Sequence, residues 1–235
     1  MNLWNSRSQK GITLGEYMLR VGILMIQGGR SEHMEAMMAA AEQLGLEVEM
    51  KPIRKSTDLE AIDGIIFPGG ESTSMKIAAQ NEGLLEDVYS FIRQTKIPVL
   101  STCAGTILLC QNNFLNATIS RNAFGRQIDS FSSPLRVLLS NDSIKPVKPQ
   151  SLGKDYFGYQ PLPMWPEAPP ESNEFLGIFI RAPRFDECKA EAVVYLNDEI
   201  VGVRDGNRLG LTFHPELTQD RRFHRWLIRE MEATS

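Results

Sequence analysis

A cysteine, a histidine and a glutamate have the types and spacing of a nucleophilic active site. Cys103 follows an apolar run and precedes Ala104–Gly105, the pattern of a strand that turns into a helix. His214 ends the strand-like stretch LGLTF (209–213), and Glu216 lies two residues further on. Residues i and i+2 of an extended chain point the same way, so the Glu216 carboxylate can orient the His214 imidazole. These residues predict a thiol nucleophile, a general base and a group that orients the base.

Backbone N–H groups that could stabilise an oxyanion are expected in two places. The stretch PGGES (68–72) follows an apolar run, and its glycines, Gly69 and Gly70, allow dihedral angles that turn amide groups inward. Ala104 opens the helix after the cysteine, so its N–H is a second candidate donor, and the positive helix terminus favours a thiolate. Gly70 and Ala104 are therefore the predicted oxyanion donors.

Each of these features also has a purely structural explanation when it is taken alone. A cysteine after a strand is usually buried, a Pro-Gly-Gly sequence is often an ordinary tight turn, and the motif HPE often has no catalytic role. The sequence holds all of them at strand ends, which is the complete set for acyl transfer through a thioester. The other two histidines, His33 early in a helix and His224 among arginines on the last helix, receive no role.

The elements that must position these residues alternate between strand and helix. The first expected strand starts at Leu19 and runs into a Gly turn. Further strands are expected at residues 47–53, 63–67, 97–101, 174–180, 190–196, 199–204 and 208–213. A hairpin turn at RDGNR is expected to join the last two. The first expected helix has Ser31 as its N-cap and stops at Gly45. Further helices are expected over 72–95, with a break near Gly83, over Ala104–Gln111 and over 220–232. The face of the first helix expected to pack on the core is Met34, Met37, Met38 and Ala41. This alternation predicts an α/β fold with a mostly parallel central sheet covered on both faces, and ligands at the carboxyl ends of its strands.

Composition limits the possible partners. The chain has 235 residues, a net charge of −4 and a pI of about 5.5, which gives no electrostatic reason to expect nucleic acid as a partner. No apolar run approaches the roughly 18 residues that a membrane span needs. The three cysteines lack paired spacing, which favours a reducing, cytoplasmic location. One domain is expected over residues 19–235, after a poorly patterned extension (1–18) and with a Pro-rich insertion at about 141–172.

Five stretches in this order resemble the glutaminase (glutamine amidotransferase) subunits of pyridoxal 5′-phosphate synthase: PGGEST, TCAG, RNAFGRQ, FIRAP and FHPEL. IQGG followed by SEH near the start also fits. The cysteine, PGGE and HPE alone indicate only the wider triad-type (class I) glutamine amidotransferases, whereas RNAFGRQ and FIRAP narrow the resemblance to the vitamin B6 branch. The resemblance implies a three-layer flavodoxin-like sandwich.

The resemblance also implies a role for each matching residue. Cys103 would be the nucleophile, His214 the general base and Glu216 its orienting group, hydrolysing L-glutamine to L-glutamate and ammonia through a glutamyl thioester. The glutamine site would be lined by Gly69, Gly70, Glu71, Arg121, Ile180 and Arg181. The two arginines suit the α-carboxylate of the substrate. Gln27 and Gly28 would contact a separate barrel-fold synthase subunit, which receives the ammonia and forms a hetero-oligomeric complex with this chain. No cofactor and no metal are implied in this chain.

The sequence departs from the family pattern at several points. Ser101 stands where the family has glycine, and a Cβ there is expected to strain the elbow and reduce activity. Arg184 replaces a histidine after FIRAP, and the chain between Cys110 and Arg121 is shorter than in the family. The insertion at 141–172 is either an inert surface loop or a change in partner docking. Two alternatives follow: a regulatory or binding subunit that has lost turnover, and a glutaminase that serves another synthase.

Overall fold

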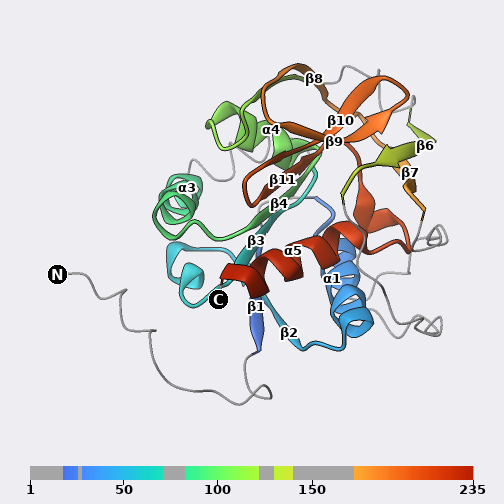
Figure 1. Cartoon of the computed structure of the whole chain (residues 1–235). Helices are drawn as coiled ribbons and strands as arrows, with labels where there is room; N and C mark the ends of the chain where they lie inside the picture. Colours follow the sequence, from blue (N-terminus) through green and yellow to red (C-terminus); the bar gives the residue numbers. More distant parts are fainter. Residues whose placement is uncertain (1–17, 26–27, 71–82, 122–129, 140–171, 235) are drawn as a thin grey trace.

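The computed structural model describes residues 18–25, 28–70, 83–121, 130–139 and 172–234. Within these ranges strands and helices alternate in the first half of the chain (Figure 1). The elements there are β1 (Leu19–Leu24), α1 (Arg30–Leu44), β2 (Val48–Ile53), the 3₁₀ turn η1 (Ser56–Leu59), β3 (Gly64–Phe67), α3 (Leu84–Thr95), β4 (Val99–Thr102) and α4 (Ala104–Gln111). The predicted helix over Ala104–Gln111 is confirmed.

The second half of the described chain is mostly strand and ends in a helix. Its elements are β5 (Ala117–Ser120), β6 (Phe131–Val137), β7 (Glu174–Phe179), β8 (Arg184–Cys188), β9 (Glu191–Leu196), β10 (Glu199–Asp205), β11 (Arg208–Leu211), the 3₁₀ turn η3 (Pro215–Leu217) and α5 (Arg222–Thr234). The hairpin predicted at RDGNR joins β10 to β11, and Gly206 takes a φ of 61° in its turn.

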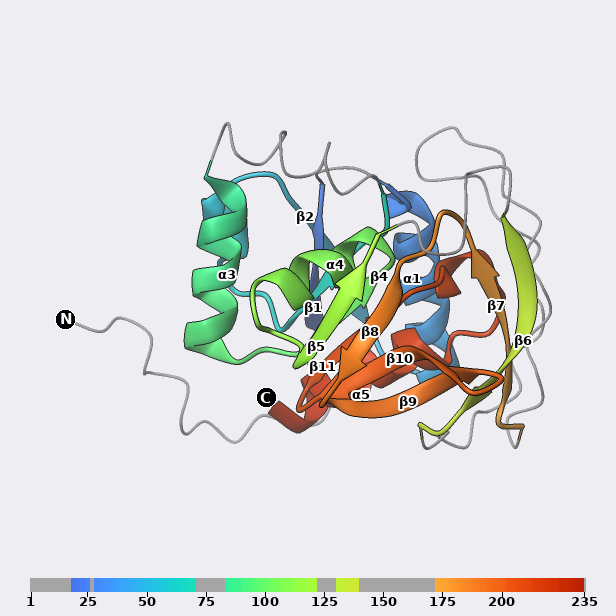
Figure 2. The ribbon, with the colours of Figure 1, turned by 90° about the horizontal axis from the view of Figure 1, so that it is seen from above.

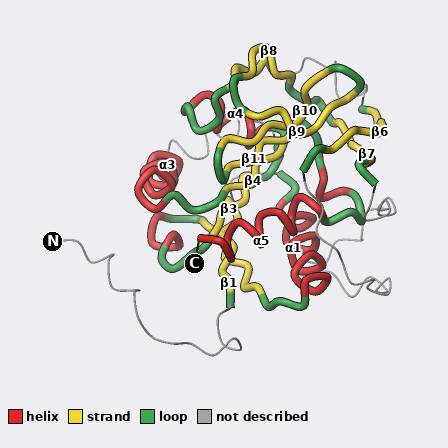
Figure 3. Tube along the Cα trace, in the orientation of Figure 1, coloured by secondary structure: helices red, strands yellow, loops and turns green. Residues whose placement is uncertain are grey.

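A single large sheet runs through the middle of the described structure (Figure 3). Its strand order is β2-β1-β3-β4-β11-β10-β9-β6-β7. Neighbours from β2 to β11 are parallel, and neighbours from β11 to β7 are antiparallel. The parallel part is the predicted one, and it brings the carboxyl ends of β1, β3, β4 and β11 to one edge.

Side chains of the parallel strands alternate between two apolar cores. Ile66 and Leu100 pack into a core shared with α1 and α5, whereas Ile65 and Val99 pack into a second core shared with α3 and α4. Successive residues of a strand point to opposite faces, so a strand buried on both sides needs an unbroken apolar run. Figure 1 shows the two helix pairs on opposite sides of the sheet, and the predicted three-layer α/β architecture is confirmed.

Three strands were not predicted: β5, β6 and β8. β5 and β8 form a separate antiparallel two-stranded sheet and lie side by side in Figure 2. These strands expose much of their surface and carry charged or polar residues, as in the β6 sequence FSSPLRV, so their apolar periodicity is weak.

Two details of the first helix correct the sequence prediction. The N-cap of α1 is Gly29 rather than Ser31, and Gly29 makes no side-chain cap bond; Gly45 ends the helix in the left-handed conformation, as expected. The buried face is His33, Ala36, Met37, Ala40 and Ala41, while Met38 is 39% exposed. Small alanines fill the buried positions of α1 because this helix packs closely against both α5 and the sheet.

The extension before Met18 and the Pro-rich insertion up to residue 171 lie outside the described residues. None of the described helices is both long and apolar enough to span a membrane.

Candidate active site

Cys103 occupies a strained turn between β4 and α4. Its backbone has φ 45° and ψ −110°, a region that residues with a Cβ rarely adopt. The Cys103 N–H donates to the Leu211 carbonyl at 2.8 Å, which ties the turn to the end of β11. Cys103 directly precedes α4, whose first N–H groups have no acceptor within the helix. Ala104 thus presents a helix-terminal N–H beside the thiol, as an oxyanion donor must.

His214 and Glu216 form the expected pair at the end of β11. The two side chains are buried, and His214 Nδ1 lies 2.7 Å from Glu216 Oε1. Burial alone lowers the pKa of His214, but the Glu216 charge and hydrogen bonding to Cys103 outweigh it and hold this pKa well above its usual value. Burial would likewise raise the pKa of Glu216, yet the neighbouring His33 and His214 hold it below its usual value. The pair therefore favours an ionised carboxylate beside a strongly basic imidazole that contacts the thiol.

Gly69 lies where the Cys103 and His214 side chains meet. A Cβ at this residue would stand 2.5 Å from His214 Cε1 and 3.2 Å from Cys103 Cβ. Only hydrogen fits there without displacing one of the two side chains. Gly69 was expected from the sequence to line the glutamine site, and the structure places it against the side chains of Cys103 and His214.

Gly28 packs directly on the peptide that joins Gly69 to Gly70. A Cβ at Gly28 would overlap the Gly69 carbonyl oxygen at 1.4 Å, and the φ of 109° is one that glycine alone adopts readily. Gly28, between β1 and α1, thus supports the candidate oxyanion loop after β3. Gln27 and Glu71, also predicted for this region, lie outside the described residues.

The predicted glutamine-contacting segment FIRAP comes back to the thiol. The Ile180 carbonyl oxygen lies 3.9 Å from Cys103 Sγ, and the Ile178 carbonyl accepts a hydrogen bond from the His214 N–H at 2.9 Å. Arg181 is exposed and has φ 47°. Arg121 directly follows β5, and its neighbour Ser120 pairs with Arg184 of β8. The β5–β8 pairing therefore brings Arg121 to the same end of the small sheet as the FIRAP segment.

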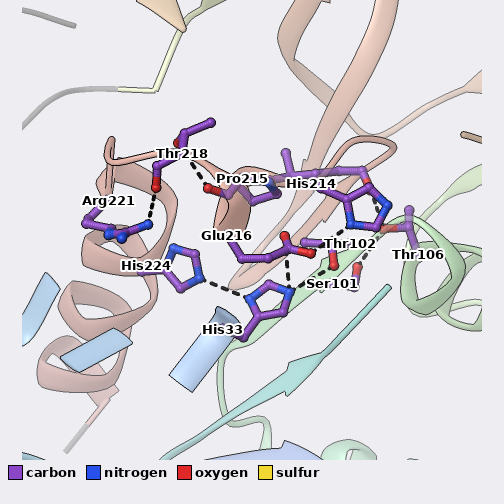
Figure 4. A network of polar contacts seen from close by, with 11 residues as sticks. His33, Ser101, Thr102, Thr106, His214, Pro215, Glu216, Thr218, Arg221 and His224 are labelled. Carbon is purple, nitrogen blue, oxygen red and sulfur yellow. Dashed lines mark hydrogen bonds and ion pairs between the residues drawn. The ribbon is translucent and has the colours of Figure 1, made fainter. Parts of the chain in front are cut away.

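A polar network continues from His214 and Glu216 into residues for which no role was predicted from the sequence (Figure 4). His33 Nε2 lies 3.4 Å from Glu216 Oε2 and 3.1 Å from Thr102 Oγ1, and His33 Nδ1 lies 3.0 Å from His224 Nε2. The clue available in the sequence was a histidine soon after a Gly-Gly turn at a strand end. Among the described residues, no group of three or more His, Cys, Asp or Glu side chains is arranged to hold a metal ion.

Comparison with known proteins identifies the family of this arrangement. The family model for SNO glutamine amidotransferases matches residues 23–145 and 168–233. The chain belongs to the SNO glutamine amidotransferase family. It is 38% identical to the pyridoxal 5′-phosphate synthase subunit PdxT of Thermococcus onnurineus over 227 residues, 91% of this chain and 99% of that protein. It is 34% identical to the PdxT of Pyrococcus furiosus, with 91% of this chain and 100% of that protein covered.

Solved structures agree with this assignment. A crystal structure of a glutamine amidotransferase aligns with a TM-score of 0.65 and 32% identity, over 90% of this chain and 98% of that one. The structure of PurLQS from Thermotoga maritima aligns with a TM-score of 0.54 at 16% identity, over 92% of this chain and 99% of that one, which shows the shared fold alone.

Ser101, the departure from the family at the nucleophile elbow, is accommodated by its neighbours. It is fully buried on β4, and its sheet partner is Gly210, which has no side chain to compete for the space. Ser101 Oγ lies 3.1 Å from both the Leu209 carbonyl oxygen and Thr106 Oγ1. Thr106 Oγ1 in turn donates to the Leu211 carbonyl at 2.8 Å. The positive φ of the elbow is at Cys103, not at Ser101.

Replacing Ser101 by the family's glycine tests whether its Cβ strains the elbow. We expect Ser101→Gly to lower the free energy of unfolding by about 1–2 kcal/mol, through a lost buried hydrogen bond and added chain entropy, with kcat within about twofold of wild type. Urea unfolding and a glutaminase assay measure the two quantities, with Ser101→Ala as the control that removes the hydroxyl and keeps the Cβ. A rise in kcat of more than about threefold in Ser101→Gly alone would restore the view that the Cβ is a hindrance.

Arg184, another departure from the family, points to the surface. Arg184 Nε lies 2.7 Å from Glu199 Oε1, and Arg184 Nη2 donates to Glu199 Oε2 at 2.8 Å. The side chain is half-exposed, so this ion pair contributes little to stability.

Proposed function

We propose that this chain is the glutaminase subunit of a pyridoxal 5′-phosphate synthase, and that Cys103, His214 and Glu216 are its catalytic triad. The observation that carries the proposal is the thiol at a strained elbow in contact with a buried imidazole–carboxylate pair. The family assignment and the PdxT relatives support the substrate and the pathway. The chain is proposed to act as one domain over residues 19–235, in the cytoplasm, where its free cysteines would stay reduced.

In the first half of the proposed reaction, His214 takes the proton of the Cys103 thiol, and the thiolate attacks the side-chain amide carbon of glutamine. The N–H groups of Gly70 and Ala104 would donate to the oxyanion of the tetrahedral intermediate. His214 then returns the proton to the leaving nitrogen, the C–N bond breaks, and ammonia leaves a glutamyl thioester on Cys103.

In the second half, His214 activates a water molecule that attacks the thioester carbon. The C–S bond breaks, the thiolate recovers its proton, and glutamate is released. Glu216 holds the imidazole in the tautomer that keeps Nε2 free for the thiol, and stabilises the imidazolium that forms in each half-reaction. Arg121 and Arg181 would bind the α-carboxylate of glutamine, beside Gly69, Gly70, Glu71 and Ile180.

The ammonia is proposed to pass to a barrel-fold synthase subunit that docks near Gln27 and Gly28. The contact of Gly28 with the Gly69–Gly70 peptide supports this arrangement, because a partner that moves the end of β1 would also move the oxyanion loop. Docking is therefore expected to change the activity of this chain.

A glutaminase assay with and without the synthase subunit tests the proposal. Purified chain alone is expected to release little glutamate, and addition of the synthase to raise the rate by at least about tenfold. Cys103→Ala should reduce release to background in both cases. Glutamate release by Cys103→Ala in the complex would refute the proposed nucleophile, and activation by a different synthase would reassign the pathway. A chain that binds the synthase but is not labelled at Cys103 by a glutamine-like electrophile would instead be a regulatory subunit.

A further inference from the structure

Two histidines outside the triad are buried together behind its carboxylate. His33 on α1 and His224 on α5 are both fully buried, and their ring centroids lie 5.2 Å apart (Figure 4). His33 Nδ1 and His224 Nε2 are 3.0 Å apart, which is a hydrogen-bond distance. Buried imidazoles are costly unless their nitrogens find partners, so the atoms they face define their role.

The other nitrogen of His33 faces the end of the triad. His33 Nε2 lies 3.4 Å from Glu216 Oε2 and 3.1 Å from Thr102 Oγ1. Glu216 uses Oε1 for His214, and its buried Oε2 makes no hydrogen bond among the described residues but faces His33 Nε2. Thr102 is the residue before Cys103. His33 therefore touches both the triad carboxylate and the strand end that carries the nucleophile.

The carboxylate decides which nitrogen of His33 carries the proton. A lone pair on Nε2 would be repelled by the ionised Glu216, so Nε2 is the protonated atom. Its N–H donates to Thr102 Oγ1 and turns its positive end toward Glu216 Oε2. Nδ1 must then accept, and the donor opposite it is the Nε2–H of His224. The hydrogen bonds thus run from His224 to His33 and on to Thr102 Oγ1, while the same His33 N–H lies against the Glu216 carboxylate, which accepts from His214.

Burial, helped by neighbouring positive charge, keeps the two histidines neutral, as this arrangement requires. Burial lowers the pKa of His33 in spite of the Glu216 carboxylate, and burial together with neighbouring positive charge lowers the pKa of His224 well below its usual value. The charged and titratable groups that face the pair are Glu216 and His214 near His33, Arg221 just before α5, and Arg225 on α5.

We propose that His33 is a positioning residue that holds Glu216 in its catalytic orientation, and that His224 fixes the tautomer of His33. This inference rests on the proposed function only in that Glu216 belongs to the triad. With Oε2 held by His33, the carboxylate cannot rotate away from His214 without losing a partner in a buried site, where an unpaired charge is costly. The orientation of His214 at the thiol is thereby fixed by His33 on α1, a residue far from His214 in the sequence.

The test compares two variants that differ in the donor at this position. His33→Gln keeps an amide N–H at the depth of Nε2, and His33→Met fills the volume without a donor. Met37→Leu, a buried change one turn further along α1, is the matched control for altered helix packing. The readouts are kcat and KM in the synthase complex, thermal stability, and the pH profile of Cys103 alkylation by iodoacetamide.

The alkylation readout needs no glutamine turnover and can be assigned to one cysteine. Burial raises the pKa of Cys110 to about 12 and that of Cys188 above its usual value, so both react slowly near neutral pH. Cys103→Ala gives the blank rate, and peptide mass analysis confirms the labelled residue.

We expect His33→Met to lower kcat by about 10- to 100-fold with little change in KM, and to move the alkylation profile to higher pH. His33→Gln should recover most of the wild-type kcat and of the wild-type alkylation profile, and His224→Leu should shift the profile in the same direction as His33→Met.

His33 only packs the core if His33→Met loses stability while its kcat and alkylation profile match those of Met37→Leu. If His33→Met does not fold, a wild-type profile in His224→Leu overturns the proposal. A wild-type complex that fails to hydrolyse glutamine would refute the proposed function, while the alkylation profiles would still decide the role of His33.

Discussion

Gly69→Ala is expected to abolish glutaminase activity, with a loss of at least about 10³-fold in kcat/KM. The added methyl group would stand 2.5 Å from His214 Cε1 and 3.2 Å from Cys103 Cβ, so the imidazole must turn away from the thiol. A misplacement of about 1 Å in a reacting group costs on the order of 10²-fold, and here the base and the substrate are displaced together. Glutamate release in the synthase complex measures the loss.

A control variant separates this effect from reduced stability. Gly45→Ala adds the same methyl group at the end of α1, where nothing lies within 4 Å, but at a φ of 68° that costs an alanine about 1 kcal/mol. We expect it to be destabilised yet active, whereas Gly69→Ala should be inactive under conditions in which circular dichroism shows it folded. Activity of Gly69→Ala within tenfold of wild type would mean that Cys103 and His214 do not react through the geometry described.

Glu216→Gln is expected to lower kcat by on the order of 10³- to 10⁴-fold with little change in glutamine binding. The carboxylate accepts from His214 at Oε1 and faces His33 Nε2 at Oε2. An amide has one acceptor and one donor end, so it must present N–H groups to His214 or to His33. Removing the negative charge also removes the main cause that raises the pKa of His214. Steady-state kinetics in the complex give kcat and KM.

Glu199→Gln is the matched control, because it neutralises a carboxylate that pairs with Arg184 at the surface. It should retain wild-type kcat, since half-exposed ion pairs contribute little. If Glu216→Gln keeps kcat within about threefold of wild type, Glu216 does not orient the base, and the positioning role proposed for His33 loses its target.

Most of the sheet could be predicted because its strands are buried on both faces. A strand such as β3 must be apolar at every position to fill two cores, and such runs are visible in the sequence. Strands β5, β6 and β8 escaped prediction because one or both of their faces are open to solvent. The N-cap of α1 was misplaced because Gly29 was needed for another purpose: a Cβ there would come within 2.9 Å of Glu216 Oε1.

The sequence by itself determined the family and the alternation of strands and helices that forms the parallel part of the sheet. It also determined which residues are the candidate nucleophile, base and orienting carboxylate. Those inferences depend on residues close together in the chain: a cysteine between a strand and a helix, and a glutamate two residues after a histidine. Tertiary structure alone decided that Gly69 stands against both Cys103 and His214, that Gly210 makes room for Ser101, and that His33 meets His224 across 191 residues. The physical reason is that these contacts arise where the ends of separate strands and helices converge, and their distances follow from the packing of whole elements rather than from any local pattern.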